Sequence, residues 1–388
     1  MKPGYSLAKN NFRTLTLMLF TGILFFAMSL KSAPPVKSGK FVVIGYVGGF
    51  RGLINTDMIE AKKLTHINYA FVDVQHNRAW LTNEATDTVN FRKLNLLKQV
   101  NPDLKILISI GGWSWSENFS DAVLTDTSRK AFAASAIEIM RKYHLDGVDI
   151  DWEYPAKPGE EGNIYRPEDK QNFTLLFQEI RKQLDLVPQK SGEKFLLTTA
   201  VGGSPSFVSH TEMGKVQQYV DYINLMTYDF SGDSIARHHT NLYPSGLFMN
   251  ENSVDNAVTE YMAAGVPAQK LVVGVAFYGH IYDMASSDGE GLNQRVVSRA
   301  RMSGGGGYTF IKDSLVNRNG YKKYWDKNAK APYLFNKEKK QFVSYDDEES
   351  VKDKCKYVRK HHLAGVMFWE YSSDPKDYLL TAINKTLN

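Results

Sequence analysis

The sequence predicts an α/β fold, a (β/α)8 TIM barrel that carries a small α+β insertion between its seventh and eighth strands. After residue 40, short runs of β-branched and aromatic residues alternate with amphipathic stretches, which is typical of βα units around a parallel sheet. Eight such runs are present, the number that closes a barrel. The 388 residues are enough for one barrel with an insertion.

The predicted strands are short and follow one another in chain order. They cover residues 41–46, 65–71, 105–110, 147–152, 195–201, 222–227, 271–277 and 364–369. Amphipathic patterns at 127–144 and 167–186 predict helices between strands, and the second opens with proline and acidic residues, as helix starts prefer.

The gap between the seventh and eighth predicted strands is far longer than one helix and its loops require. It contains four glycines at 304–307 and then Tyr308, Tyr321, Trp325 and Tyr333. We expect this excess to form an inserted α+β module at about residues 284–345. In a barrel such a module rises from the C-terminal face, where the loops build active sites.

The N-terminal segment has the order of a signal peptide. Lys2, Lys9 and Arg13 precede an uncharged, mostly apolar run at 14–30. The sequence therefore predicts a signal peptide at 1–33, a catalytic barrel at 34–388 and a secreted or periplasmic protein. An uncleaved anchor is the alternative because the run approaches the length of a membrane span, and only then would the protein contact a membrane.

Composition excludes several other classes. Hydrophobic residues make up 43% and charged residues 23% of the chain, as in ordinary globular proteins. The net charge of +5 is small against 47 basic and 42 acidic residues, so no nucleic-acid partner is expected. A single cysteine, Cys355, cannot form an internal disulfide. We expect a monomer.

Three acidic side chains alternate along the fourth predicted strand. Because strand side chains alternate between two faces, Asp149, Asp151 and Glu153 share one face at a spacing of about 6–7 Å. Like charges so close in a partly desolvated barrel share protons, which raises the pKa of at least one acid, as a general acid requires. A Mg²⁺ or Ca²⁺ site or a capping cluster is the alternative. The sequence shows no His or Cys cluster that favours zinc.

The segment DGVDIDWEYP at 146–155 resembles the DxxDxDxE signature of glycoside hydrolase family 18, the chitinase family. The four acidic positions are filled by Asp146, Asp149, Asp151 and Glu153. Further matches follow in family order at strand ends, and the resemblance covers essentially everything after residue 40. These matches are SIGG at 109–112, MTYD at 226–229, FYG at 277–279 and Trp369.

The resemblance implies a retaining, substrate-assisted hydrolysis of β-1,4 linkages between N-acetylglucosamine units in chitin and chito-oligosaccharides. Glu153 would protonate the glycosidic oxygen and later activate water, while the substrate's own acetamido oxygen attacks and forms an oxazolinium ion. Asp151 would orient the acetamido group, Asp149 would hold or receive a proton, and Tyr228 would donate to the acetamido oxygen. The resemblance implies no metal and no other cofactor.

Aromatic faces are expected to bind the sugar rings, which present an apolar C–H surface. By the resemblance, Trp369 floors the subsite of the distorted sugar, and Trp113 and Tyr154 line the cleft. For the weaker candidates at strand ends, packing inside the barrel is the alternative. The weaker candidates are Gly112, Tyr46, Phe71, Met226, Asp229 and Tyr278.

Some features depart from the family pattern or leave the activity open. His280 and Ser231 stand where many relatives carry Arg and His, and we interpret His280 as a hydrogen-bonded loop histidine. Three alternatives are an endo-β-N-acetylglucosaminidase acting on glycoproteins, a bacterial cell-wall or spore-cortex hydrolase, and a non-catalytic chitin-binding, lectin-like protein. The presence of Glu153 argues against the lectin-like protein.

Overall fold

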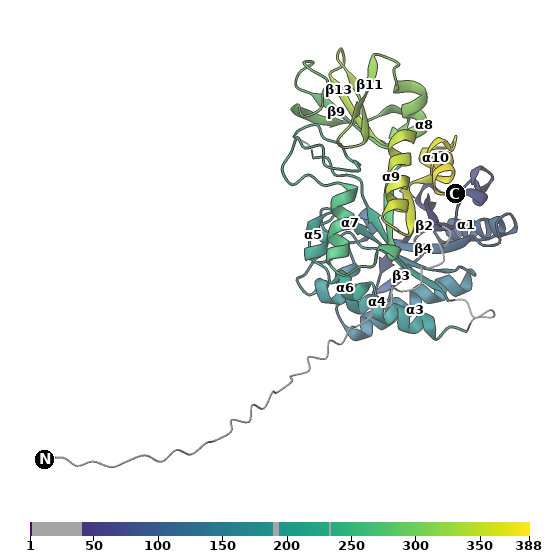
Figure 1. Cartoon of the computed structure of the whole chain (residues 1–388). Coiled ribbons are helices and arrows are strands. Elements are labelled where there is room, and N and C mark those ends of the chain that lie inside the picture. Colours follow the sequence, from purple (N-terminus) through teal and green to yellow (C-terminus); the bar gives the residue numbers. More distant parts are fainter. Residues whose placement is uncertain (2–40, 189–193, 233) are drawn as a thin grey trace, which may run out of the picture. The chain divides into compact units, whose positions relative to one another are not determined.

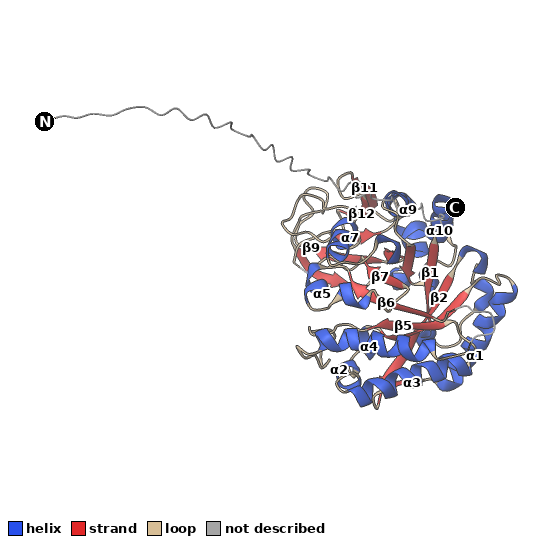
Figure 2. Ribbon diagram, turned by 60° about the horizontal axis from the view of Figure 1, so that its bottom comes forward, coloured by secondary structure: helices blue, strands red, loops and turns tan. Residues whose placement is uncertain are grey.

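The computed structural model describes residue 1 and residues 41–188, 194–232 and 234–388. Within these residues, eight parallel strands pair side by side and close into a barrel through β1 and β2 (Figures 1 and 2). Around the barrel the order is β1 (Val42–Gly48), β14 (Gly365–Trp369), β8 (Leu271–Ala276), β7 (Tyr222–Met226), β6 (Leu196–Gly202), β5 (Gly147–Asp151), β4 (Lys105–Gly111) and β2 (His66–Gln75). The predicted fold class is confirmed, and each predicted strand overlaps one of these eight.

Helices follow most of the barrel strands. They are α1 (Glu84–Leu96), α2 (Phe119–Ala122), α3 (Asp126–Lys142), α4 (Asp169–Asp185), α5 (Pro205–Ser209), α6 (Met213–Val216), α7 (Val254–Ala263), α9 (Glu348–Lys360) and α10 (Tyr378–Leu387). Capping boxes begin two of them, at Thr125 with Ser128 for α3 and at Asp347 with Ser350 for α9. Each box satisfies backbone donors that a helix start otherwise leaves free.

The insertion forms a second, antiparallel sheet with the order β10-β9-β13-β12-β11. Figure 1 shows it at one end of the barrel, beside the short helix α8 (Tyr308–Phe310). Its strands are β9 (Gly279–Met284), β10 (Val296–Ala300), β11 (Tyr321–Asp326), β12 (Ala331–Asn336) and β13 (Gln341–Tyr345). All five lie between β8 and β14 in the chain, which confirms the predicted place of the insertion.

The apolar core lies between the barrel strands and the surrounding helices. Trp152 points to this side, because it is 1% exposed and its ring stacks on Phe119 at 5.2 Å between centroids. The strand period thus separates Trp152 from the acids on either side of it. One short strand, β3 (Arg78–Trp80), extends β2 as an antiparallel hairpin and was not predicted.

None of the helices in the described part of the chain is long and apolar enough to cross a membrane. The predicted signal peptide at 1–33 lies outside the described residues, apart from residue 1. The division of the chain at residue 33 therefore stays a prediction.

Candidate active site

The acidic side chains gather at the C-terminal end of β5. Asp149 and Asp151 belong to the strand, and Glu153 follows it after one residue. Their exposed fractions are 0%, 4% and 9%, so the charges are withdrawn from bulk water. Gly147 begins the strand and lets it approach β6 closely, because a Cβ there would lie 2.3 Å from the carbonyl oxygen of Leu196.

Asp149 is the deepest of the three acids and has the most hydrogen-bond donors. Hydroxyl groups of Tyr46, Ser109 and Thr198 donate to its carboxylate at 2.9, 2.7 and 2.5 Å. Burial raises the pKa of Asp149, while these hydrogen bonds act in the opposite direction. The donors come from β1, β4 and β6, so three strands fix the position of one carboxylate.

Asp151 lies next on the same face and has an unsatisfied oxygen. Its Oδ1 atom is buried and has no hydrogen-bond partner among the described residues. Burial, followed by the charges of Glu153 and Asp149, raises the pKa of Asp151 well above its ordinary value. A buried acceptor without a partner is costly, so the geometry favours a ligand that donates a hydrogen bond here.

Glu153 lies where β5 meets the cleft. Its backbone N–H donates to the Ser116 hydroxyl at 2.9 Å, which fixes the turn that follows the strand. Burial raises the pKa of its carboxyl group to about 7, helped by the charges of Asp229 and Glu160 and opposed by a hydrogen bond with Tyr154. A carboxyl group with this pKa holds a proton near neutrality and can also release it, as a general acid and base must.

A cleft of about 950 Å³ opens beside these acids. Every predicted site residue lines it except Asp149, which lies deeper, and Gly112. Its lining is Tyr46, Phe50, Phe71, Gly111, Trp113, Ser114, Trp115, Asp151, Glu153, Tyr154, Ala200, Met226, Tyr228, Asp229, Tyr278, Gly279, His280, Arg299, Gly305 and Trp369. Gly112 packs closely under the Phe71 ring of the lining, because a Cβ there would lie 2.6 Å from that ring.

Three nearly parallel aromatic rings lie at one part of the cleft. Trp369 lies 5.3 Å from Phe71 and 6.1 Å from Phe50 between ring centroids, with interplanar angles of 17° and 12°. Phe50 was not predicted, although its aromatic side chain just after the first strand was a usable signal. Trp113 lies elsewhere on the rim, 48% exposed, and meets Tyr154 edge to face. These surfaces suit the apolar faces of sugar rings.

The Tyr228 hydroxyl is available to a ligand. Within the described residues its hydrogen bond goes to the sulfur of Met367 at 3.8 Å, a weak acceptor. Burial, with the charges of Asp151, Asp229 and Glu153, raises the pKa of Tyr228 well above its ordinary value. The hydroxyl therefore keeps its proton and can donate it to an oxygen in the cleft.

A cluster of Asp229, His239 and His280 forms another part of the site. The Tyr278 hydroxyl and Nε2 of His280 lie 2.8 and 2.5 Å from Oδ1 of Asp229, and Nδ1 of His239 lies 3.7 Å from it. Burial and then the neighbouring His280 lower the pKa of His239 to about 4, so that ring is neutral at pH 7. Burial acts to raise the pKa of Asp229, but the two imidazoles outweigh it and hold that pKa well below its usual range.

The sequence analysis placed only part of this cluster. Asp229 was predicted as a binding residue, and His280 as a loop histidine. His280 instead lies on strand β9 and its ring reaches Asp229. His239 was not predicted, because nothing in its local pattern brings it near Asp229. The three side chains could hold a metal ion, since one ligand atom from each lies within 4.8 Å of the others.

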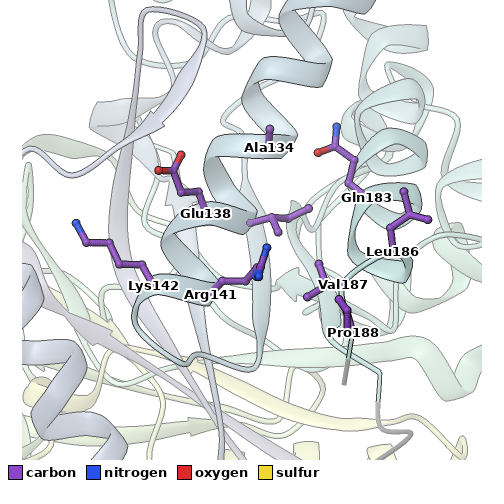
Figure 3. A pocket seen from close by; sticks show the side chains of 9 residues that line it. Ala134, Glu138, Arg141, Lys142, Gln183, Leu186, Val187 and Pro188 are labelled. Carbon is purple, nitrogen blue, oxygen red and sulfur yellow. The ribbon is translucent and has the colours of Figure 1, made fainter. Parts of the chain in front are cut away.

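A second hollow of about 770 Å³ lies between α3 and α4 (Figure 3). Its lining is Ala134, Ile137, Glu138, Arg141, Lys142, Gln183, Leu186, Val187 and Pro188. None of the predicted site residues lines this hollow.

Comparison with known proteins identifies one protein family and several similar chitinases and related enzymes. The family model described as Glycosyl hydrolases family 18 matches residues 42–374. Chitinase A1 of Niallia circulans is 37% identical, and the match covers 93% of this chain and 60% of that protein. Chitinase B of Serratia marcescens is 34% identical, and the match covers 86% of this chain and 78% of that protein. The solved structure of a family 18 N-acetylglucosaminidase from Paenibacillus barengoltzii has a TM-score of 0.81 at 41% identity, covering 89% of this chain and 99% of that one. This chain thus spans 60% of the length of Chitinase A1.

Proposed function

This chain belongs to the glycosyl hydrolases of family 18, and on that premise we propose that it is a chitinase. It hydrolyses β-1,4 linkages between N-acetylglucosamine units in chitin and chito-oligosaccharides. The observation that carries this proposal is the Glu153 carboxyl group, which lies in the cleft at the end of an acidic column with its pKa raised to about 7. Its similarity to Chitinase A1 and Chitinase B supports the substrate class.

In the first step Glu153 donates its proton to the glycosidic oxygen as the bond to the anomeric carbon breaks. The acetamido oxygen of the same sugar attacks that carbon and forms an oxazolinium ion, so no protein nucleophile is required. Glu153, now ionised, then takes a proton from the water that opens the ring. Two displacements at one carbon leave the product with retained configuration.

Asp151 and Tyr228 position the acetamido group for this attack. The unpartnered Oδ1 atom of Asp151 accepts the acetamido N–H, and its negative charge stabilises the developing cation. The Tyr228 hydroxyl, otherwise bonded to a sulfur, donates to the acetamido oxygen. Asp149, surrounded by three hydroxyl donors, takes or gives a proton as the charge on Asp151 changes.

Aromatic rings supply most of the binding. Trp369 floors the subsite of the distorted sugar, with Phe71 and Phe50 as nearly parallel neighbours. Trp113 and Tyr154 bind sugar rings in another part of the cleft. Gly112 keeps the Phe71 ring close to the backbone. Tyr46, Met226, Asp229 and Tyr278 complete the lining.

An exo-acting N-acetylglucosaminidase is the second candidate. The Paenibacillus barengoltzii structure, 41% identical and matched over 99% of its length, is described as an N-acetylglucosaminidase, which supports this candidate. Product length separates the two activities: single N-acetylglucosamine units from every oligosaccharide indicate the exo enzyme, and dimers or longer products indicate a chitinase. A glycoprotein endo-β-N-acetylglucosaminidase would release a glycan from a glycoprotein and leave chito-oligosaccharides intact.

The decisive experiment compares Glu153→Gln with the wild-type protein on soluble chito-oligosaccharides. The variant loses the proton and keeps the shape, so kcat falls about 10²- to 10⁴-fold while oligosaccharide binding is retained. Glu160→Gln is the matched control, because it removes a nearby acid that influences Glu153 only through its charge. Equal loss in both variants, or a kcat of Glu153→Gln equal to that of the wild type, contradicts the assignment. Binding without turnover in the wild type indicates the lectin-like protein.

Export through the N-terminal segment is part of the same proposal. The basic residues Lys2, Lys9 and Arg13 before the apolar run at 14–30 support a signal peptide. The protein then acts outside the cytoplasm, where its polymeric substrate is found. It acts as a monomer. N-terminal sequencing of protein recovered from the culture medium tests the cleavage.

A further inference from the structure

Three side chains of types that can ligate a metal meet at the wall of the cleft, where Asp229 and His280 line it and His239 is buried beside them. Asp229 follows β7, His239 lies in the loop after it, and His280 belongs to β9 of the inserted sheet. We propose that these three residues bind one divalent transition-metal ion of the zinc class, and that the bound ion inhibits the enzyme. The fold thus assembles a histidine cluster that the sequence does not show locally.

The donor set and its spacing suit zinc. Two imidazoles and one carboxylate, with a further position open, are a known ligand combination for Zn²⁺. With metal–ligand bonds of about 2.0–2.2 Å, tetrahedral ligands lie roughly 3.4 Å apart. Oδ1 of Asp229 lies 2.5 Å from His280 and 3.7 Å from His239, and all three donor atoms fall within 4.8 Å of one another. Small rotations of these side chains reach the required geometry.

His239 supplies an independent reason to expect a ligand. Its side chain is fully buried, and neither ring nitrogen has a partner at hydrogen-bond distance among the described residues, since Nδ1 faces Oδ1 of Asp229 at 3.7 Å. The backbone holds it in place, because its N–H donates to the Ser344 hydroxyl at 2.9 Å and its carbonyl accepts from Phe230 at 3.0 Å. Buried polar atoms without partners are rare and costly. A metal ion would satisfy the nitrogen that faces Asp229.

Arg299 competes with the ion for this place. Its guanidinium group lies within hydrogen-bond distance of both ring nitrogens of His280. Arg299 is exposed and lies on β10, so it can move to solvent when a cation enters. The Tyr278 hydroxyl, which donates to the same Asp229 oxygen, must also yield or turn. Metal binding and the Arg299 contact therefore exclude each other.

Inhibition follows from the position of the cluster. Asp229, His280 and Arg299 all line the cleft, so an ion with an open coordination position occupies space and charge that a sugar would use. This second half of the inference rests on the proposed hydrolase activity. Metal binding itself does not, and it is measured separately.

The test is calorimetric titration of the full chain with zinc chloride, with His239→Gln and His280→Arg as the ligand variants. We expect one zinc site in the wild type and at least about tenfold weaker zinc binding in each variant. Even mutations of residues that only support the metal ligands lower metal affinity by about tenfold or more. His76→Gln is the matched control, an exposed histidine outside the cluster that leaves binding unchanged. Arg299→Gln should bind zinc more tightly than the wild type.

Equal zinc binding in wild type, His239→Gln and His280→Arg would overturn the site, as would no binding at millimolar zinc. Circular dichroism shows whether each variant is folded, and His280→Arg decides the matter if the buried His239→Gln does not fold. In the hydrolysis assay zinc should raise KM and leave kcat unchanged. Binding without inhibition overturns the second half alone, and absence of hydrolysis by the metal-free protein contradicts the proposed function, not the site.

Discussion

Glu153 shows how burial prepares one residue for its chemistry. Its side chain is 9% exposed, and loss of water raises its pKa from an ordinary value of 4.5 to about 7. The pKa of the neighbouring Asp151 is raised as well. The two acids therefore share protons, and ionising both at once is unfavourable. The same burial that raises the pKa of Glu153 also costs folding stability when the group ionises.

The sign of this cost gives a pH-dependent prediction. Because the folded state binds the Glu153 proton more tightly than the unfolded state, the stabilising contribution is complete below pH 4.5 and is lost as pH rises to about 7. Glu153→Gln stays neutral throughout. It should therefore match the wild type in unfolding free energy at pH 4 and exceed it at pH 8 by up to about 3 kcal/mol.

Urea unfolding of both proteins at the two pH values measures this difference. Glu160→Gln serves as the control, since it leaves the buried Glu153 carboxyl group in place and should give a much smaller gain at pH 8 than Glu153→Gln. A Glu153→Gln variant that is less stable than the wild type at pH 8 would show that the carboxylate is stabilised in the fold, contrary to its raised pKa.

At the scale of elements, the sequence predicts the barrel strands well because each strand is a short run rich in apolar and β-branched residues between turns. The acids on β5 were also predictable, since the two-residue period alone places Asp149, Asp151 and Glu153 on one face. The contacts between loops were not predictable. Arg299 reaches the cleft, and His239 lies beside Asp229 and His280, only because the loop after β7 and the inserted sheet pack together. No local period encodes such a contact.

Strand β5 can hold the acids in place only if it lies close to β6. Gly147→Ala places a Cβ 2.3 Å from the Leu196 carbonyl oxygen, which belongs to the backbone and cannot rotate away. We expect the variant to lose about 1–3 kcal/mol of stability, and kcat to fall because Asp149 and Asp151 shift with the strand. Gly232→Ala is the control, where the added Cβ meets no described atom within 4 Å.

Thermal unfolding and chito-oligosaccharide hydrolysis are measured on both glycine variants. If Gly147→Ala keeps the wild-type melting temperature and kcat, the close approach of β5 and β6 is not required. Loss of stability with unchanged kcat would separate strand packing from the alignment of the acids.

At the scale of the whole molecule, barrel and inserted sheet share a core. Along β13, Val343 and Tyr345 belong to the large apolar cluster that also contains the barrel residues. Phe342, on the opposite face of the same strand, belongs to the smaller cluster of the inserted sheet. One strand thus has side chains in both clusters, as its two-residue period requires. The inserted sheet also supplies His280 and Arg299 to the cleft, so its stability and the activity are connected.

We therefore predict that the two parts unfold together. Phe342→Ala removes a fully buried ring that lies 5.4 Å from Tyr333 between ring centroids, at a cost of about 3–5 kcal/mol. Calorimetry should show one transition that moves to lower temperature as a whole, with activity lost over the same range. The exposed Lys337→Ala change, in the turn between β12 and β13, should stay within about 0.5 kcal/mol. A separate early transition in Phe342→Ala, with the main one unmoved, would show instead that the inserted sheet unfolds alone and that the shared strand does not couple it to the barrel.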